Sequence, residues 1–208
     1  MPGPPIMGWQ TFGDQHVMRR VFFTAIALAA CTSALALEPE SESPQAQARV
    51  LAQEFVALLK PRLKQAMEEG GPTRAIAVCA DAAPAIADAL STRSGWTVER
   101  VSLKSRNASR AAPDPWERSV LLEFDRRQAA GDEAADISFG EIVGDRYRYM
   151  QAQGVEPLCL LCHGKGLADD VQATLKQYYP DDWAVGYSLG EVRGAISLST
   201  VVEVDSAP

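Results

Sequence analysis

Apolar residues recur at helical spacing along two neighbouring stretches of the chain. In residues 50–67 they fall on one face: Val50, Leu51, Phe55, Leu58, Leu59, Leu63 and Met67. In residues 73–92 the same spacing places Ile76, Cys79, Ala83, Ile86 and Leu90 on one stripe. Gly70-Gly71-Pro72 separates the two stretches and stops the first. The pattern predicts two consecutive helices, with Pro61 and Pro84 as points where each can kink.

Alternating patterns follow in the second half of the chain. Residues 96–105 predict a strand, residues 137–153 a hairpin about Gly144-Asp145, and residues 190–204 a closing strand. Helical patterns occupy residues 115–130 and about 169–178, and residues 106–114 read as a turn-rich loop. This order predicts a single α+β domain over residues 50–204, an antiparallel sheet with flanking helices. Residues 37–49 form a polar tether ahead of it.

The first 36 residues have the features of a secretory signal preceded by an over-extended start. Met18 is the expected true start, two arginines follow it, and the apolar run of residues 21–30 is shorter than the roughly 20 residues that span a bilayer. Cleavage after Ala36 would release a soluble protein, whereas a lipobox ending at Cys31 would give a lipid anchor. Both predict an exported domain, periplasmic and not transmembrane.

Removing the signal changes the inventory of charged and chemically reactive residues. The net charge moves from −7 for the whole chain to −8, and such an acidic domain is a poor candidate for nucleic-acid binding. His163 becomes the only histidine, and the cysteines are Cys79, Cys159 and Cys162. A peroxidase-like enzyme is not expected, because no histidine remains to act as a distal acid or base.

The sequence Cys159-Leu-Leu-Cys162-His163 is the C-x-x-C-H pattern of covalent haem c attachment. Two thiols at this spacing reach the two vinyl groups of a porphyrin, and the following imidazole binds the iron as proximal ligand. A structural zinc site would need adjacent Cys162 and His163 to bind one ion. A thioredoxin-type site lacks its βαβ context, and a plain disulfide leaves His163 without a role. One covalent haem is therefore the favoured interpretation.

The opposite face of the iron has three protein candidates, Cys79, Met67 and Met150, or it stays open. Met67 continues an apolar stripe, and methionine there is usually a packing residue. Met150 lies in the predicted strand before the motif. Taken alone, Cys79 is more simply read as a small apolar residue of the core, although a thiolate ligand would favour ferric iron.

Four segments resemble the family catalogued as Domain of Unknown Function 3365. They are "AIAVCADAAPAIA", "VSLKSRNASRAAPDPWE", "PLCLLCHG" and "YYPDDWAVGYSLGEVRGAISL". The family comprises exported c-type haem domains, found alone or as input modules of sensor kinases, so the resemblance implies a PAS-like fold. It also implies that Cys79 is the distal iron ligand. Arg106, Asn107, Trp116 and Arg193 match positions that form the pocket, where arginines can pair with haem propionates.

Two functions remain open at this point. A redox or gas sensor is predicted if reduction or a diatomic ligand displaces Cys79; with no kinase following in the chain, the signal would pass to a separate partner. An electron-transfer cytochrome that docks a redox partner protein is the alternative. The sequence sets no oligomeric state. The loop "RNASRAAPD" lacks the proline and second asparagine usual in the family, so the resemblance does not extend to the contacts of this loop.

Overall fold

A computed structural model describes residues 43–202 of the chain. The predicted signal, the lipobox cysteine Cys31 and residues 37–42 of the tether lie outside the described residues. Residues 43–202 belong to one compact unit. The first described residue, Ser43, caps the first helix, because its hydroxyl accepts a hydrogen bond from the backbone N–H of Ala46 at 3.3 Å.

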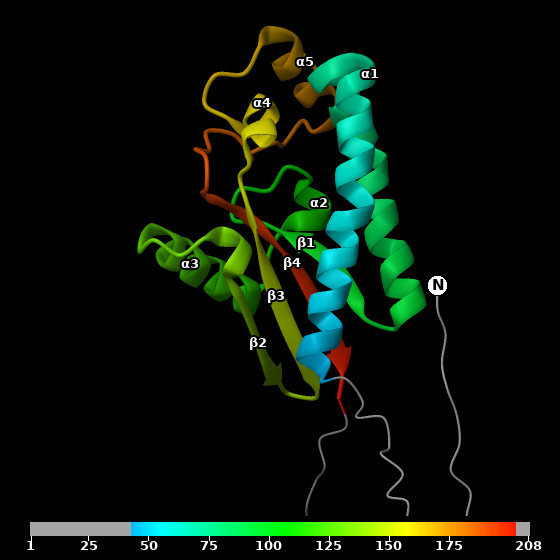
Figure 1. The fold of residues 1–208 in the computed structure, drawn as a ribbon, viewed down its shortest axis with the longest axis vertical. Helices are drawn as coiled ribbons and strands as arrows, with labels where there is room; N and C mark the ends of the chain where they lie inside the picture. The colour runs from blue at the N-terminus through cyan, green and yellow to red at the C-terminus, as the bar shows by residue number, and fades with distance from the viewer. Residues whose placement is uncertain (1–42, 203–208) are drawn as a thin grey trace, which may run out of the picture. The chain divides into compact units, whose positions relative to one another are not determined.

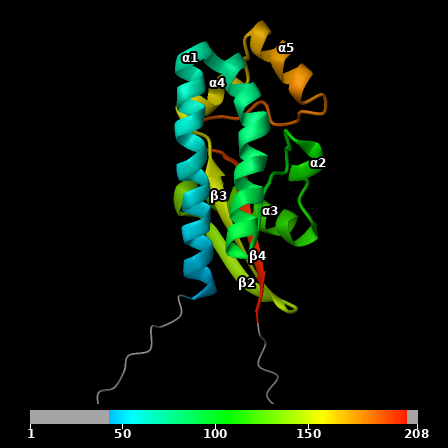
Figure 2. The ribbon, with the colours of Figure 1, turned by 90° about the vertical axis from the view of Figure 1, so that its right-hand side faces the viewer.

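The element α1 (Pro44–Ser94) consists of two helical arms joined by a break at Gly70 and Gly71. Gly71 has φ 70° and ψ −162°, a conformation essentially restricted to glycine. The chain reverses there, so the two arms run side by side in opposite directions (Figures 1 and 2). The two predicted helices are therefore confirmed, and the backbone at Pro61 and Pro84 stays helical. The first helix begins at Pro44, so residues 44–49, predicted as part of the tether, are helical instead.

Four strands form one sheet in the order β1-β4-β3-β2, with every neighbouring pair antiparallel. They are β1 (Thr97–Val101), β2 (Ser138–Val143), β3 (Arg146–Gly154) and β4 (Val192–Val201). The predicted hairpin is confirmed, since β2 and β3 pair from Ser138 with Gln151 to Val143 with Arg146. The last strand therefore lies between the first strand and the hairpin.

Helices cover both faces of this sheet (Figure 1). The arms of α1 pack on one face, where Phe55 and Leu90 meet Tyr149 and Leu198. Helix α3 (Pro115–Ala129) packs on the other through Val120, Leu121 and Phe124, against a core that includes Met150. The predicted α+β class is confirmed. By length and composition α1 could cross a membrane, but core helices pass the same test, and α1 packs on the sheet.

The remaining elements are short. They are α2 (Ala108–Ala111), η1 (Ala134–Asp136), η2 (Pro157–Cys159), α4 (Leu160–His163) and α5 (Asp169–Tyr178). Of these, α4 and α5 lie together at one end of the domain (Figure 1). Helix α5 packs against the second arm of α1 through Ile76, Val171 and Leu175. Two residues of the predicted apolar stripe, Val50 and Leu58, are exposed instead, because the face of α1 that meets the sheet is narrower than the sequence pattern.

Candidate functional site

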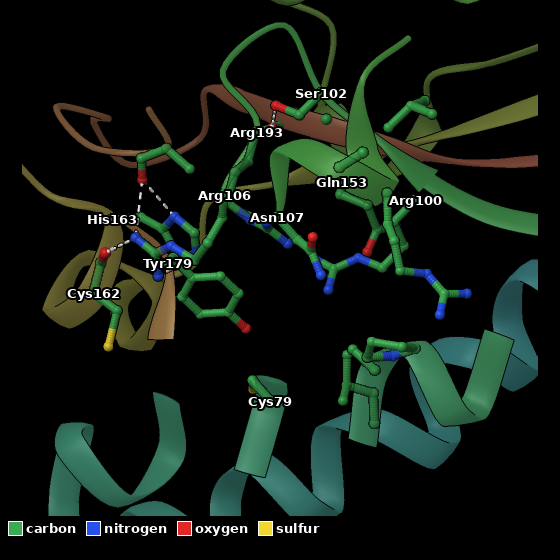
Figure 3. Close-up of a pocket in the computed structure, with 18 of the residues that line it drawn as sticks. Cys79, Arg100, Ser102, Arg106, Asn107, Gln153, Cys162, His163, Tyr179 and Arg193 are labelled. Atoms are coloured by element: carbon green, nitrogen blue, oxygen red, sulfur yellow. Dashed lines mark hydrogen bonds between the residues drawn. The ribbon is translucent and has the colours of Figure 1, made fainter. Parts of the chain in front are cut away.

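A cavity of about 440 Å³ lies between α1, the sheet end formed by β1 and β4, and the segment around α4 (Figure 3). This volume is within the range of small-molecule and cofactor sites. The structure brings seven of the eight predicted site residues to its lining: Cys79, Arg106, Asn107, Cys159, Cys162, His163 and Arg193.

The cavity has one apolar wall and one cationic wall. Both arms of α1 supply the apolar wall, which includes Leu59, Leu63, Met67, Ile76 and Ala83. The strands β1 and β4 and the loop after β1 supply the cationic wall, which includes Arg100, Lys104, Arg106 and Arg193. The site is therefore suited to a flat apolar ligand with acidic groups along one edge.

His163 is held as a neutral imidazole with one unprotonated ring nitrogen. Its Nδ1 donates to the backbone carbonyl of Ala184 at 2.7 Å. Burial, and then the positive charges of Arg193 and Arg106, lower the pKa of His163 far below its usual value. Because Nδ1 carries the proton, the Nε2 lone pair is free to accept, which is the state that binds a metal.

The motif is tied through its backbone to the loop that follows α5. The carbonyl of His163 accepts from the N–H of Tyr187 at 2.9 Å, and that of Gly164 accepts from Gly186 at 3.0 Å. The backbone of Gly164 also lies close to that of Leu160, since a Cβ at residue 164 would lie 2.5 Å from the carbonyl oxygen of Leu160. These contacts place the Ala184 carbonyl beside the imidazole.

Arg106 joins the same two segments through its guanidinium. Its Nε donates to Asp182 at 3.1 Å, and its Nη2 donates to the carbonyls of Cys162 and Ala184. Both members of the Arg106–Asp182 ion pair are largely buried, with side chains 14% and 9% exposed. Its Nη1 lies 3.4 Å from Nε2 of His163. Arg106 is thus already paired, and its main contacts are within the protein.

Cys79 reaches the cavity from the second arm of α1, and Figure 3 shows it on the side opposite Cys162 and His163. All three cysteines of the described chain are free thiols. Burial raises the pKa of the Cys79 thiol, and the nearby charge of Arg100 opposes that rise most strongly. Within residues 43–202 no three His, Cys, Asp or Glu side chains cluster around a common metal position. A zinc site built from these residues is therefore disfavoured.

The structure separates the two methionine candidates. Met67 lines the cavity, whereas Met150 is fully buried in the core under α3, on the far face of the sheet. The alternation along β3 explains this difference, because Met150 faces α3 while its neighbour Tyr149 faces α1. Met150 is thus removed as a candidate ligand, and Cys79 and Met67 remain.

Arg100 and Arg193 are cations without a carboxylate partner in the part of the chain that the structure describes. Burial lowers the pKa of Arg100 to about 10, with a contribution from the charge of Arg193. Arg100 was missed by sequence reasoning. The signal was its spacing from Val98, because residues two apart share one face of a strand and Val98 packs against α1.

Comparison with known proteins gives the family. The family model described as Tll0287-like matches residues 38–200. This chain belongs to the Tll0287-like family. It is the family catalogued as Domain of Unknown Function 3365, so the resemblance seen in the sequence is confirmed. No protein with a curated description matches the sequence.

A solved structure of the Tll0287-like family is similar over most of the chain. It is titled the crystal structure of the cyanobacterial heme-protein Tll0287, with 25% sequence identity and a TM-score of 0.57. The match covers 79% of this chain and 99% of that one. The similarity therefore extends over most of the fold.

One residue expected from the Tll0287-like resemblance lies elsewhere. Trp116 is not part of the cavity lining, and this corrects the expectation that it helps to form the pocket. It sits in the first turn of α3, where its Nε1 donates to Glu141 at 2.7 Å and its ring lies under Arg148, 4.2 Å from ring centroid to Cζ. The sheet separates α3 from the cavity, so Trp116 orders the β2–β3 hairpin instead.

The paired state of Arg106 makes a prediction about stability. Arg106→Ala should lower the free energy of unfolding by about 3 kcal/mol, because it leaves Asp182 buried without its partner. Arg110→Ala is the matched control: Arg110 also pairs with an aspartate, Asp88, but both side chains are exposed, and the expected loss is under about 1 kcal/mol. Urea unfolding of the cofactor-free chain measures both. Equal losses would contradict the assignment.

Proposed function

We propose that this chain is an exported protein that carries one covalently attached haem c and responds to redox change or to a diatomic gas. The observation that carries the proposal is the convergence of four groups on one cavity: Cys159, Cys162, His163 and, from α1, Cys79. The similar structure in the family is titled a heme-protein, which supports the same ligand class.

The residues fit a haem in several independent respects. The apolar wall from α1 matches the porphyrin ring, and the unpaired Arg100 and Arg193 match its two carboxylate side chains. The free Nε2 of His163 supplies an iron ligand. When bound, haem would supply a one-electron ferric–ferrous couple and a coordination position open to exchange.

Cys159 and Cys162 would form the covalent links. In each link the thiol adds across a vinyl double bond: a carbon–sulfur bond forms, and the thiol hydrogen goes to the other vinyl carbon. No external oxidant or reductant is consumed by this addition. The two cysteines stand on either side of the start of α4, and His163 ends the same short helix. One helical turn therefore presents both thiols and the imidazole together.

His163 would bind the iron through Nε2, and Ala184 would keep that nitrogen available. The carbonyl of Ala184 holds the proton on Nδ1 at 2.7 Å. The 3.4 Å contact from Arg106 Nη1 to Nε2 would give way to the metal. Arg106 would still hold the loop through Asp182 and the two carbonyls that it contacts.

Cys79 is the proposed distal ligand, with Met67 as the competing side chain on the same wall. The positive charge of Arg100 favours the thiolate form of Cys79, and an iron ion would favour it further. Met67 has no comparable electrostatic support, since a thioether carries no charge in either state. A thiolate donates charge to the iron and stabilises the ferric state.

A sensing role is supported by where Cys79 lies in α1. The same arm continues to Ile86 and Leu90, which pack in the core against the sheet. Release of Cys79 from the iron would remove one constraint on the position of this arm. Because the arm also packs against the sheet, a shift in its position can transmit a two-state change. Electron transfer is the second candidate, favoured by two exposed apolar side chains at the motif: Leu158 directly precedes Cys159, and Leu161 lies between the two cysteines.

Ligand identity is tested with the chain produced in a host that has c-type haem maturation machinery. Wild type should carry covalent haem with a low-spin ferric EPR signal. Cys79→Ala should keep the covalent haem but lose that signal, and its matched control Met67→Leu should keep both. Carbon monoxide should bind ferrous wild type if Cys79 is displaceable. An unchanged ferric spectrum in Cys79→Ala would remove Cys79, and wild type without haem would refute the proposed function.

Replacing Arg100, which has no carboxylate partner, should affect the stability of the haem-free and haem-bound protein differently. Arg100→Met should not destabilise the haem-free chain, because no carboxylate is lost and a poorly solvated charge is removed. In the haem-bound protein the same change should cost about 1.5–3 kcal/mol, the size of a hydrogen bond to a charged group. Chemical unfolding of both forms measures the difference. A loss of equal size in the haem-free chain would contradict the assignment.

A further inference from the structure

Tyr179 is a cavity residue that none of the roles above uses. It directly follows α5, and its backbone is fixed at both ends: its N–H donates to Leu175 at 2.7 Å, and its carbonyl accepts from Asp182 at 3.2 Å. Its ring packs against the cluster of Ile76, Val171 and Leu175 and lies 6.0 Å from the guanidinium carbon of Arg106. The side chain is thus held in place from several sides.

The hydroxyl of Tyr179 points into the cavity. Tyr179 lines the cavity, and Figure 3 shows its hydroxyl oxygen directed toward the side that carries Cys79. Ile76, under the ring, is three residues before Cys79 and therefore on the same face of α1. Among residues 43–202 the hydroxyl has no hydrogen-bond partner. A polar group with this placement is available to whatever occupies that side of the cavity.

The phenol is a donor under all ordinary conditions. Burial raises the pKa of Tyr179 to about 12, and the Cys79 thiolate is the next largest cause of the rise. The group therefore remains an O–H, and its electrostatic coupling to Cys79 agrees with the direction seen in Figure 3. A neutral O–H that donates to a thiolate lowers the charge that the sulfur can give to a metal.

We infer that Tyr179 is the hydrogen-bond donor that sets how strongly Cys79 holds the iron. This inference rests on the proposed function, and it adds a positioning residue from the end of α5 to a ligand pair from α1 and α4. Donation from the hydroxyl withdraws charge from the thiolate, so it favours the ferrous form and raises the reduction potential. Loss of the hydroxyl has the opposite effect.

Tyr179→Phe tests the inference because it removes only the hydroxyl and keeps the packed ring. Its matched control is Tyr178→Phe, since the neighbouring tyrosine is 42% exposed and does not line the cavity. The haem-bound proteins are compared by covalent haem content, ferric EPR spectrum and midpoint potential. Tyr179→Phe should keep its haem and shift the ferric–ferrous equilibrium roughly tenfold toward ferric, about 59 mV lower in potential. Tyr178→Phe should match wild type in all three.

The outcomes separate this inference from the proposal beneath it. Haem-bound Tyr179→Phe with the wild-type potential and EPR spectrum would overturn the inference alone. If Cys79→Ala leaves the wild-type spectrum unchanged, the inference falls with Cys79 ligation, while haem attachment stands. If wild type carries no haem, both fail. A potential shift of the same size in Tyr178→Phe would also overturn it, because the effect would then not come from the cavity hydroxyl.

Discussion

The hydrogen bond from His163 Nδ1 to the carbonyl of Ala184 decides what the site can be. It fixes the imidazole as a neutral acceptor at Nε2 and ties α4 to the loop after α5. The backbone pairs from Tyr187 to His163 and from Gly186 to Gly164 hold the same junction. This junction therefore fixes the position of the motif relative to the loop after α5.

Charge is the second constraint, and it acts through residues distant in sequence. Arg106 meets Asp182 across the junction and is neutralised there. Arg100 and Arg193 are not neutralised by any described residue, so the cavity keeps an excess of positive charge against an apolar wall. A cofactor with an apolar ring and two carboxylates would complete both walls. The hairpin of α1 adds Cys79 to the opposite side only because Gly71 allows its two arms to fold back on each other.

Local periodicity was enough to predict most elements of this fold. Apolar spacings of 3.6 or 2 residues predict the two arms of α1, the β2–β3 hairpin, α3 and α5. The C-x-x-C-H spacing identifies Cys159, Cys162 and His163 as site residues. Pairings between distant segments were not predictable in this way. The Arg106–Asp182 pair, the orientation of Arg100 and the choice between Met67 and Met150 depend on which face of each element meets the cavity. Trp116 shows the same limit, since the resemblance placed it in the pocket and the sheet separates it from there.

The proposed role of Cys159 and Cys162 is to hold one haem through carbon–sulfur bonds. Mass spectrometry of the fully denatured, proteolysed chain, after production with c-type maturation and treatment with a thiol-alkylating reagent, tests it most directly. We expect one haem on the peptide that contains Cys159 and Cys162, with both thiols blocked, while the peptide that contains Cys79 is alkylated. Haem released on denaturation, or alkylation of Cys159 and Cys162, would contradict it.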